Sequence, residues 1–238
     1  MTGTAAIWHD VEHGSYDADL PLWRELAAAS GGPILDLGAG TGRVAVDLAA
    51  QGHEVVALDS NPGLLAKLAE RSASVTTVHA DARSFALGVR FPLILAPMQL
   101  PQILGGRDGR LAMLQRVHAH LPEGGLFAAA LSDPRDAVPA DGAAAAPLPD
   151  ILERDGWVFS SQPLSVRDEG ARVVIERRRQ AVSPAGAIDA EDARIELDLV
   201  TLDEFESEAR AAGLEPADRR VIPETLDHIG STVVTCRR

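Results

Sequence analysis

The hydrophobic pattern of the chain alternates short apolar runs with amphipathic stretches between Pro33 and Leu131. The amphipathic stretches place apolar residues at helical spacing. A regular alternation of strand and helix predicts a parallel sheet with helices on both faces. The predicted strands are residues 33–38, 54–59, 75–79, 91–96 and 126–131, and the predicted helices are residues 41–51, 61–72 and 109–121.

The first 30 residues precede this alternation and mix polar with aromatic side chains. Within them, Leu20 to Ala29 reads as a helix that carries Leu22, Trp23 and Leu26 on one face. Trp8 and Trp23 are expected in the core. We interpret residues 1–30 as a segment that covers a ligand-binding site on the strand–helix core.

After the fifth predicted strand the pattern changes to a loop followed by alternating strands. Residues 134–156 are rich in Pro, Ala, Asp and Gly, which predicts a surface loop. Residues 158–166, 172–182 and 194–200 read as strands, and Ile195, Leu197 and Leu199 alternate with charged residues in the last of them. These strands predict an antiparallel cover inserted into the fold.

The end of the chain predicts one helix and two strands. Thr201 and Glu204 have the spacing of a capping box, and Gly213 is placed to end the helix. Residues 215–222 and 231–236 are apolar enough for strands. We therefore expect one domain over residues 1–238, divided into an N-terminal cover (1–30), a ligand-binding core (31–133), a loop with inserted strands (134–200) and a C-terminal helix with a strand hairpin (201–238).

A glycine-rich turn follows the first predicted strand and opens the first helix. Residues 34–43 run from an apolar strand through Gly38, Gly40 and Gly42 to Arg43. Glycine permits positive φ and lets a ligand lie against the backbone, and the helix N-terminus offers unpaired N–H groups. The second strand ends in Asp59, 17 positions after Gly42, a spacing suited to a carboxylate that holds ribose hydroxyls.

These motifs resemble those of the class I S-adenosylmethionine-dependent methyltransferases. The resemblance rests on Asp36 to Gly42, on Leu58 to Pro62 and on His79 to Ala82, and it is clear from Pro33 to about Asp133. It implies a Rossmann-like α/β fold with a mostly parallel seven-stranded sheet, and S-adenosyl-L-methionine as donor with S-adenosyl-L-homocysteine as product. The donor-binding residues that it implies are Asp36, Gly38, Ala39, Gly40, Gly42, Arg43, Asp59, Ser60, Asn61, Asp81, Ala82, Pro97 and Met98.

Other interpretations of these motifs stay open. Residues 40–45 also fit the dinucleotide-binding pattern, so a nicotinamide-dependent reductase is the alternative enzyme. A protein that binds the donor or its product without catalysis and regulates a partner is an alternative from another class. The resemblance places adenine at Asp81, although Asp81 could instead cap the turn before Arg83.

The binding position of the methyl acceptor is expected where the fourth strand ends, because ligands bind beyond the carboxyl ends of parallel strands. Gln99 could orient an acceptor there but cannot take its proton at neutral pH. The Asn-Pro-Pro-aromatic motif of DNA amino-methyltransferases is absent from residues 97–100. His9, His13 and Tyr16 are the candidate bases, and no residue pattern indicates a metal site.

Arg177, Arg178 and Arg179 stand in the middle of one inserted strand. They could grip an acidic acceptor, or they could pair across strands with Glu196 and Asp198.

Composition narrows the function classes. The net charge of −13 argues against binding a nucleic-acid backbone, and no apolar run approaches the ~20 residues of a membrane span. The lone Cys236 cannot form an intrachain disulfide and is expected to be packed, while His118 and His120 are expected at the surface. We expect a cytoplasmic enzyme that acts on a small-molecule acceptor; the sequence leaves its oligomeric state open.

Overall fold

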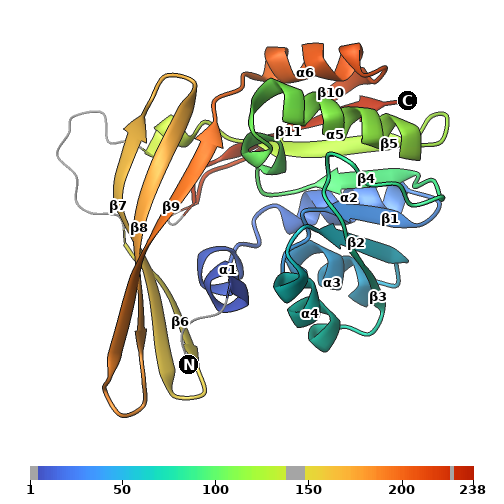
Figure 1. The fold of residues 1–238 in the computed structure, drawn as a ribbon. Helices are drawn as coiled ribbons and strands as arrows, with labels where there is room; N and C mark the ends of the chain where they lie inside the picture. The colour runs from blue at the N-terminus through green and yellow to red at the C-terminus, as the bar shows by residue number, and fades with distance from the viewer. Residues whose placement is uncertain (1–4, 138–147, 226–227) are drawn as a thin grey trace.

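The computed structural model describes residues 5–137, 148–225 and 228–238. It contains two sheets that lie side by side with the first helix between them (Figure 1). The larger sheet has seven strands in the order β10-β11-β5-β4-β1-β2-β3, and the smaller has four in the order β6-β7-β8-β9. This confirms the predicted Rossmann-like fold with a mostly parallel sheet and an antiparallel cover.

Five adjacent strands of the large sheet, β5-β4-β1-β2-β3, are parallel, and β11 joins antiparallel to β5. Strand order reverses between β1 and β4, which is where ligands bind in sheets of this kind. The strands of this sheet are β1 (Ile34–Leu37), β2 (Val55–Asp59), β3 (Val75–His79), β4 (Leu93–Ala96), β5 (Leu126–Leu131), β10 (Glu215–Ile222) and β11 (Ser231–Arg237).

Helices cover both faces of the large sheet, because each face buries its own apolar cluster. Helices α5 (Gly106–His120) and α6 (Leu202–Ala211) pack on one face through Met113, Leu114 and Phe205. On the other face lie α2 (Leu20–Ala29), α3 (Arg43–Ala50) and α4 (Pro62–Arg71). Every residue of β1 and β4 is buried, as expected for strands covered twice.

The small sheet consists of β6 (Asp150–Arg154), β7 (Trp157–Asp168), β8 (Arg172–Val182) and β9 (Ile188–Asp198). It extends the predicted cover in two ways. Residues 150–154, expected to be loop, form β6, and β9 begins at Ile188. The rest of the predicted loop is the 3-10 turn η2 (Pro134–Ala137), residues 148–149, the turn at residues 155–156, and residues 138–147, which lie outside the described residues.

Helix α1 (Ala5–His13) was not predicted, although it lies within the predicted N-terminal cover. Its buried residues include Asp10 and Glu12 as well as Trp8 and Val11, so an apolar pattern alone does not reveal it. Trp8 and Trp23 are both buried, as expected. None of the described helices is both long and apolar enough to span a membrane.

Two side-chain predictions were wrong. His120 is buried, where its Nδ1 lies 2.6 Å from the Arg116 carbonyl and its Nε2 accepts from the Leu87 N–H, because these backbone groups replace water as partners. Glu196 pairs with Arg172 and Arg194 instead of the arginine run, since the β8–β9 register sets Arg177 opposite Ala193. Other predictions hold: the capping box of Thr201 and Glu204 is formed, and the Cys236 thiol is buried.

Candidate active site

The glycine turn between β1 and α3 forms one wall of the site. Gly38, Gly40 and Gly42 all have positive φ, and Gly42 is the N-cap of α3. A Cβ built at Gly40 would lie 2.2 Å from His9 Nε2, so the His9 ring packs directly over this turn. His9 Nδ1 lies 3.2 Å from Thr41 Oγ1, which holds the ring there.

Asp59 lies at the end of β2 and faces the same turn. Its Oδ2 accepts from the Gly40 N–H at 2.8 Å, and its Oδ1 accepts from the Asn61 N–H at 2.8 Å. Each carboxylate oxygen keeps capacity for a further donor. Asn61 caps α4 by accepting from Gly63 and Leu64, and Ser60 is exposed beside it.

Asp36 lies inside the sheet below the turn, buried with no partner for Oδ1 among the described residues. Burial raises the pKa of this carboxyl to about 7, against the stabilising effect of Arg43. Arg43 itself forms a double hydrogen bond with Asp19, lies over the Tyr16 ring at 5.1 Å and donates to the Tyr16 carbonyl. Arg43 therefore fastens the segment around Tyr16 to the turn.

Asp81 follows β3 and forms a double ion pair with the Arg83 side chain, whose backbone N–H it also accepts. This is the turn-capping contact that the sequence left as an alternative. Ala82 is buried next to it. Hydrogen bonds from Arg83 hold the pKa of Asp81 below its usual value, so Asp81 is a charged acceptor at this strand end.

The exit of β4 has an unusual backbone. Met98 and Gln99 both have positive φ, 55° and 62°, although neither is glycine. Consecutive left-handed residues of this kind cost energy and are found where a site requires a particular loop shape. Pro97 is buried before them, and the Gln99 side chain reaches the cavity described next.

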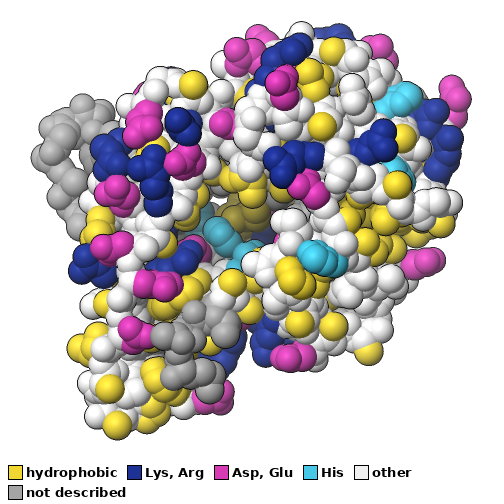
Figure 2. Space-filling view, viewed as in Figure 1, with side chains coloured by type: hydrophobic (Ala, Val, Ile, Leu, Met, Phe, Trp, Pro, Cys, Tyr) yellow, Lys and Arg dark blue, Asp and Glu magenta, His cyan; other side chains and the backbone are white. Residues whose placement is uncertain are grey.

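A cavity of about 540 Å³ lies between the β4 exit, α1 and the inner face of the small sheet. Figure 2 shows the hollow between the two parts of the molecule, with histidine and apolar side chains inside it. His9, His13, Tyr16, Met98 and Gln99 all line it. The cavity thus gathers the four candidate catalytic residues and one candidate donor-binding residue.

The histidines of the cavity are held in the neutral form. Burial lowers the pKa of His13 to about 3, and the neighbouring His9 ring, 5.0 Å away, acts in the same direction. Burial also lowers the pKa of His9, although Asp10 and Asp59 oppose the shift. A neutral imidazole has a free nitrogen lone pair, so either ring is able to accept a hydrogen bond, but the low pKa of His13 makes that ring a weak base.

Sequence reasoning missed His228, which lines the cavity and lies 4.7 Å from the Tyr16 ring. It also missed Gln102, which is buried and joins the β4 exit to both sheets. Gln102 Nε2 donates to the Ser132 and Asp198 carbonyls, and its Oε1 accepts from the Ser132 N–H. A glutamine within an apolar strand exit was the available signal for Gln102; no pattern indicated His228.

Comparison with known proteins fits this geometry. Residues 34–125 match the family model of a methyltransferase domain, whereas no curated protein sequence matches the chain. Among solved structures, an amino pentose methyltransferase from Micromonospora echinaspora is 24% identical, with a TM-score of 0.70 over 97% of this chain and 92% of that one. A sugar N-methyltransferase from a Streptoalloteichus species is 16% identical, with a TM-score of 0.78 over 100% and 94%.

A third similar structure is a 1,6-didemethyltoxoflavin-N1-methyltransferase from Burkholderia thailandensis, with bound 1,6-didemethyltoxoflavin and S-adenosylhomocysteine. It is 21% identical, with a TM-score of 0.58 over 97% of this chain and 83% of that one. These likenesses show a shared fold. With the domain match, they show that residues 34–125 are similar to a methyltransferase domain and that the chain shares the fold of these methyltransferases.

Proposed function

We propose that this protein transfers a methyl group from S-adenosylmethionine to a nitrogen of a small-molecule acceptor bound in the 540 Å³ cavity. The observation that carries the proposal is the position of this cavity. It opens at the β4 exit, at the point where strand order reverses, and is closed by α1 and the small sheet. Its size suits a small molecule better than a polymer. Both sheets and α1 then act as one functional domain over residues 1–238.

The residues at the strand ends fit the donor. The turn has no side chain at Gly40, and the His9 ring lies where a Cβ would be, so the methionine part would meet bare backbone beside His9. The Asp59 carboxylate can accept from ribose hydroxyls, and Asp81 with Ala82 is placed for adenine beyond β3. Gly38, Ala39, Gly42 and Arg43 would shape the turn, and Asp36 would support it from below.

When bound, S-adenosylmethionine supplies a methyl group on a positively charged sulfur, which departs as a neutral thioether. No acid is needed for that departure, so the chain's task is alignment of the acceptor, and good alignment is worth roughly 7–11 kcal/mol. Gln99 and Tyr16 border the cavity and would orient the acceptor. The small sheet and α1 exclude water around it.

An amine arrives protonated and must lose a proton before its lone pair can form the new bond. The neutral imidazole of His9 lines the cavity and would take this proton, since Asp10 and Asp59 oppose the lowering of its pKa by burial. His13, whose pKa burial lowers to about 3, is too weak a base for this step and would accept a hydrogen bond from the amine. The similar structures support nitrogen as the methylated atom, since two of them are described as N-methyltransferases.

The test measures donor binding and turnover separately. Calorimetry with S-adenosylhomocysteine should show binding to the native protein, and Asp59→Ala should weaken it by about 1.5–3 kcal/mol for each hydrogen bond lost. Incubation with S-adenosylmethionine and a panel of small amines should give methylated products by mass spectrometry. Binding of NADH without S-adenosylhomocysteine would favour the reductase instead.

A further inference from the structure

The wall that the small sheet presents to the cavity is apolar at one end. Val166, Ile175 and Ile195 stand in register on β7, β8 and β9, so their side chains form one row across three strands. Pro163 and Leu197 line the cavity beside this row. A continuous apolar row gains free energy by covering apolar surface, roughly 25 cal/mol for each Å² buried. It offers no hydrogen bond to a polyhydroxylated face.

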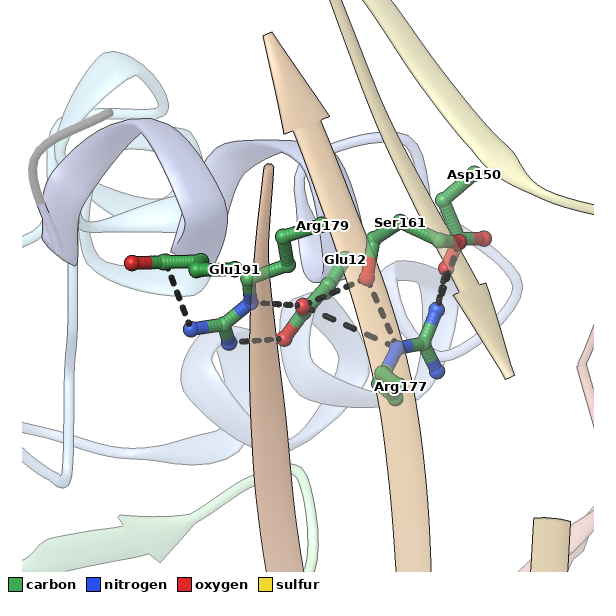
Figure 3. A network of polar contacts seen from close by, with 6 residues as sticks. All are labelled: Glu12, Asp150, Ser161, Arg177, Arg179 and Glu191. Carbon is green, nitrogen blue, oxygen red and sulfur yellow. Dashed lines mark hydrogen bonds and ion pairs between the residues drawn. The ribbon is translucent and has the colours of Figure 1, made fainter. Parts of the chain in front are cut away.

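The charged groups of the cavity lie further along the same face of the small sheet, where Arg177 and Arg179 follow Ile175 at two-residue spacing on β8, and they are already paired. Arg179 donates through Nε and one terminal nitrogen to both oxygens of Glu12, at 2.8 and 2.9 Å. Arg177 donates to Asp150, to Ser161 Oγ at 2.8 Å and to the Ser161 carbonyl at 3.1 Å (Figure 3). Ser161 Oγ in turn donates to Glu12 at 2.7 Å. Both guanidiniums are neutralised by these carboxylates, so an anionic ligand would compete with Glu12 and Asp150 for them.

The charges around the cavity offset one another. Its described lining contains the carboxylates of Glu12, Asp19 and Asp150 and the guanidiniums of Arg177 and Arg179, and Arg43 pairs with Asp19. His9 and His13 add no charge, because burial keeps both rings neutral. The sequence contains no Lys or Arg at 138–147 or 226–227, the internal positions outside the described residues. A phosphate would enter this cavity without a free side-chain cation to meet it, at a large desolvation cost.

We propose that the acceptor is an aliphatic or aromatic amine with an apolar body and without phosphate or carboxylate groups. The inference rests on the proposed methyltransferase function and names its substrate class. The apolar body lies against Val166, Ile175 and Ile195, and the amine points to the α1 side, where His9 would take its proton. The chain's net charge of −13 also attracts a protonated amine and repels an anion.

The test uses three probes on protein saturated with S-adenosylhomocysteine: cyclohexylamine, glucosamine and glucosamine 6-phosphate. Calorimetry and ligand-observed NMR give their affinities. Cyclohexylamine should bind at least about tenfold more tightly than glucosamine, a difference of ~1.4 kcal/mol, and glucosamine 6-phosphate should bind most weakly. Equal or tighter binding of the phosphorylated amine would overturn the inference, and so would the absence of binding by cyclohexylamine.

Two substitutions on the same strand give a matched control. Ile195→Ser places a hydroxyl in the apolar row and should weaken cyclohexylamine binding about tenfold. Ile188→Ser is the same change at the far, exposed end of β9 and should leave the affinity unchanged. Equal effects of the two changes would contradict the proposed orientation.

A third substitution tests the role of charge. Ile175→Arg adds an unpaired cation to the row and should reverse the preference in favour of glucosamine 6-phosphate, which an unchanged order would contradict. S-adenosylhomocysteine affinity, measured alone on every variant, reports on the methyltransferase assignment. The acceptor class can therefore fail while donor binding stands, and loss of donor binding in the native protein would count against the function itself.

Discussion

The two sheets of this protein are stabilised in different ways. The large sheet has a buried apolar cluster on each face, and its central strands β1 and β4 are buried throughout. The small sheet shares one small cluster of four buried residues, Trp8, Val11, Phe159 and Ala181, and the first two belong to α1. The small sheet therefore completes its apolar packing only with the N-terminal helix in place.

Ion pairs replace apolar burial on the small sheet. Arg167 with Glu176, Arg172 with Glu196 and Arg178 with Asp192 lie on exposed surface, where such pairs contribute ~0–1 kcal/mol each. The pairs that join α1 to its surroundings are more buried. The comparison indicates that the donor-binding core is stabilised by apolar burial, whereas the cover depends on α1 and on charge.

Of the changes that test this difference between the two sheets, Glu12→Ala should have the largest effect. Glu12 is buried, and hydrogen bonds from Arg179 and Ser161 keep its pKa low although burial alone would raise it. Its removal leaves Arg179 and Arg177 without a shared carboxylate, which should lower the free energy of unfolding by about 3–5 kcal/mol. Urea unfolding measures this change.

The control for Glu12→Ala is Glu196→Ala, which breaks exposed pairs with Arg172 and Arg194 on the same sheet. It should change the free energy of unfolding by no more than about 1 kcal/mol. Comparable losses in the two variants would show that burial does not distinguish the α1 contacts from the surface pairs.

The next effect concerns the core alone. Gly40→Ala places a methyl group where His9 Nε2 lies 2.2 Å away, at a φ of +58°. It should weaken S-adenosylhomocysteine binding about a hundredfold, or ~2.7 kcal/mol, because the turn and His9 must both shift. Gly52→Ala is the control: its φ is +89° but no atom lies within 4 Å of the added carbon. Gly52→Ala should lower the free energy of unfolding by about 1 kcal/mol and leave S-adenosylhomocysteine affinity unchanged. A similar loss of affinity in both variants would show that backbone strain alone causes it.

A smaller effect should appear as a pH dependence of core stability. The pKa of Asp36 is raised from 3.8 to about 7 in the folded protein, chiefly by burial. Between pH 4 and 7 the unfolded chain loses this proton while the folded chain keeps it, so rising pH destabilises the fold, by at most ~1.4 kcal/mol per pH unit. Asp36→Asn should remove this contribution. Parallel stability curves of variant and native protein over that range would refute it.

The smallest effect on donor affinity should come from substitutions in the wall of the cavity. Gln99→Ala and Tyr16→Phe should lower the methyl-transfer rate several-fold while donor affinity stays within a few-fold, because both residues line the cavity away from the glycine turn. The measurement is the rate with an identified acceptor beside calorimetry on the same protein. Full rates in both variants would move the acceptor position elsewhere in the cavity.

Much of the core could be predicted from the sequence. The bounds of β3, β5, β8, β10 and α2 agree with the predicted ranges. These elements follow hydrophobic period and capping chemistry, which are local properties. The three segments that line the cavity were also predicted, because the fourth strand exit is fixed by topology and the N-terminal and inserted segments had no place in the parallel sheet.

The contacts of the cover could not be predicted in the same way. Asp10 and Glu12 read as solvent-facing residues, yet both are buried against arginines far along the chain. Arg177 and Arg179 were expected to bind an acceptor or to pair with Glu196 and Asp198, whereas both pair with Glu12, Arg177 also with Asp150 and Arg179 also with Glu191. Long-range charge pairing leaves no periodic signal, so tertiary structure was needed to identify these partners.

The contacts of helix α1 determine which segments must be replaced together to change the acceptor preference of this protein. Asp10 binds Thr41 and Arg71 of the core and Arg154 of β6, while two residues later Glu12 binds Arg179 of β8. A chimera that received β6 to β9 from another methyltransferase but kept this α1 would contain Glu12 without its matching arginines. A chimera must therefore exchange two segments that are separate in sequence, residues 5–13 and residues 150–198. The donor-binding core can stay unchanged.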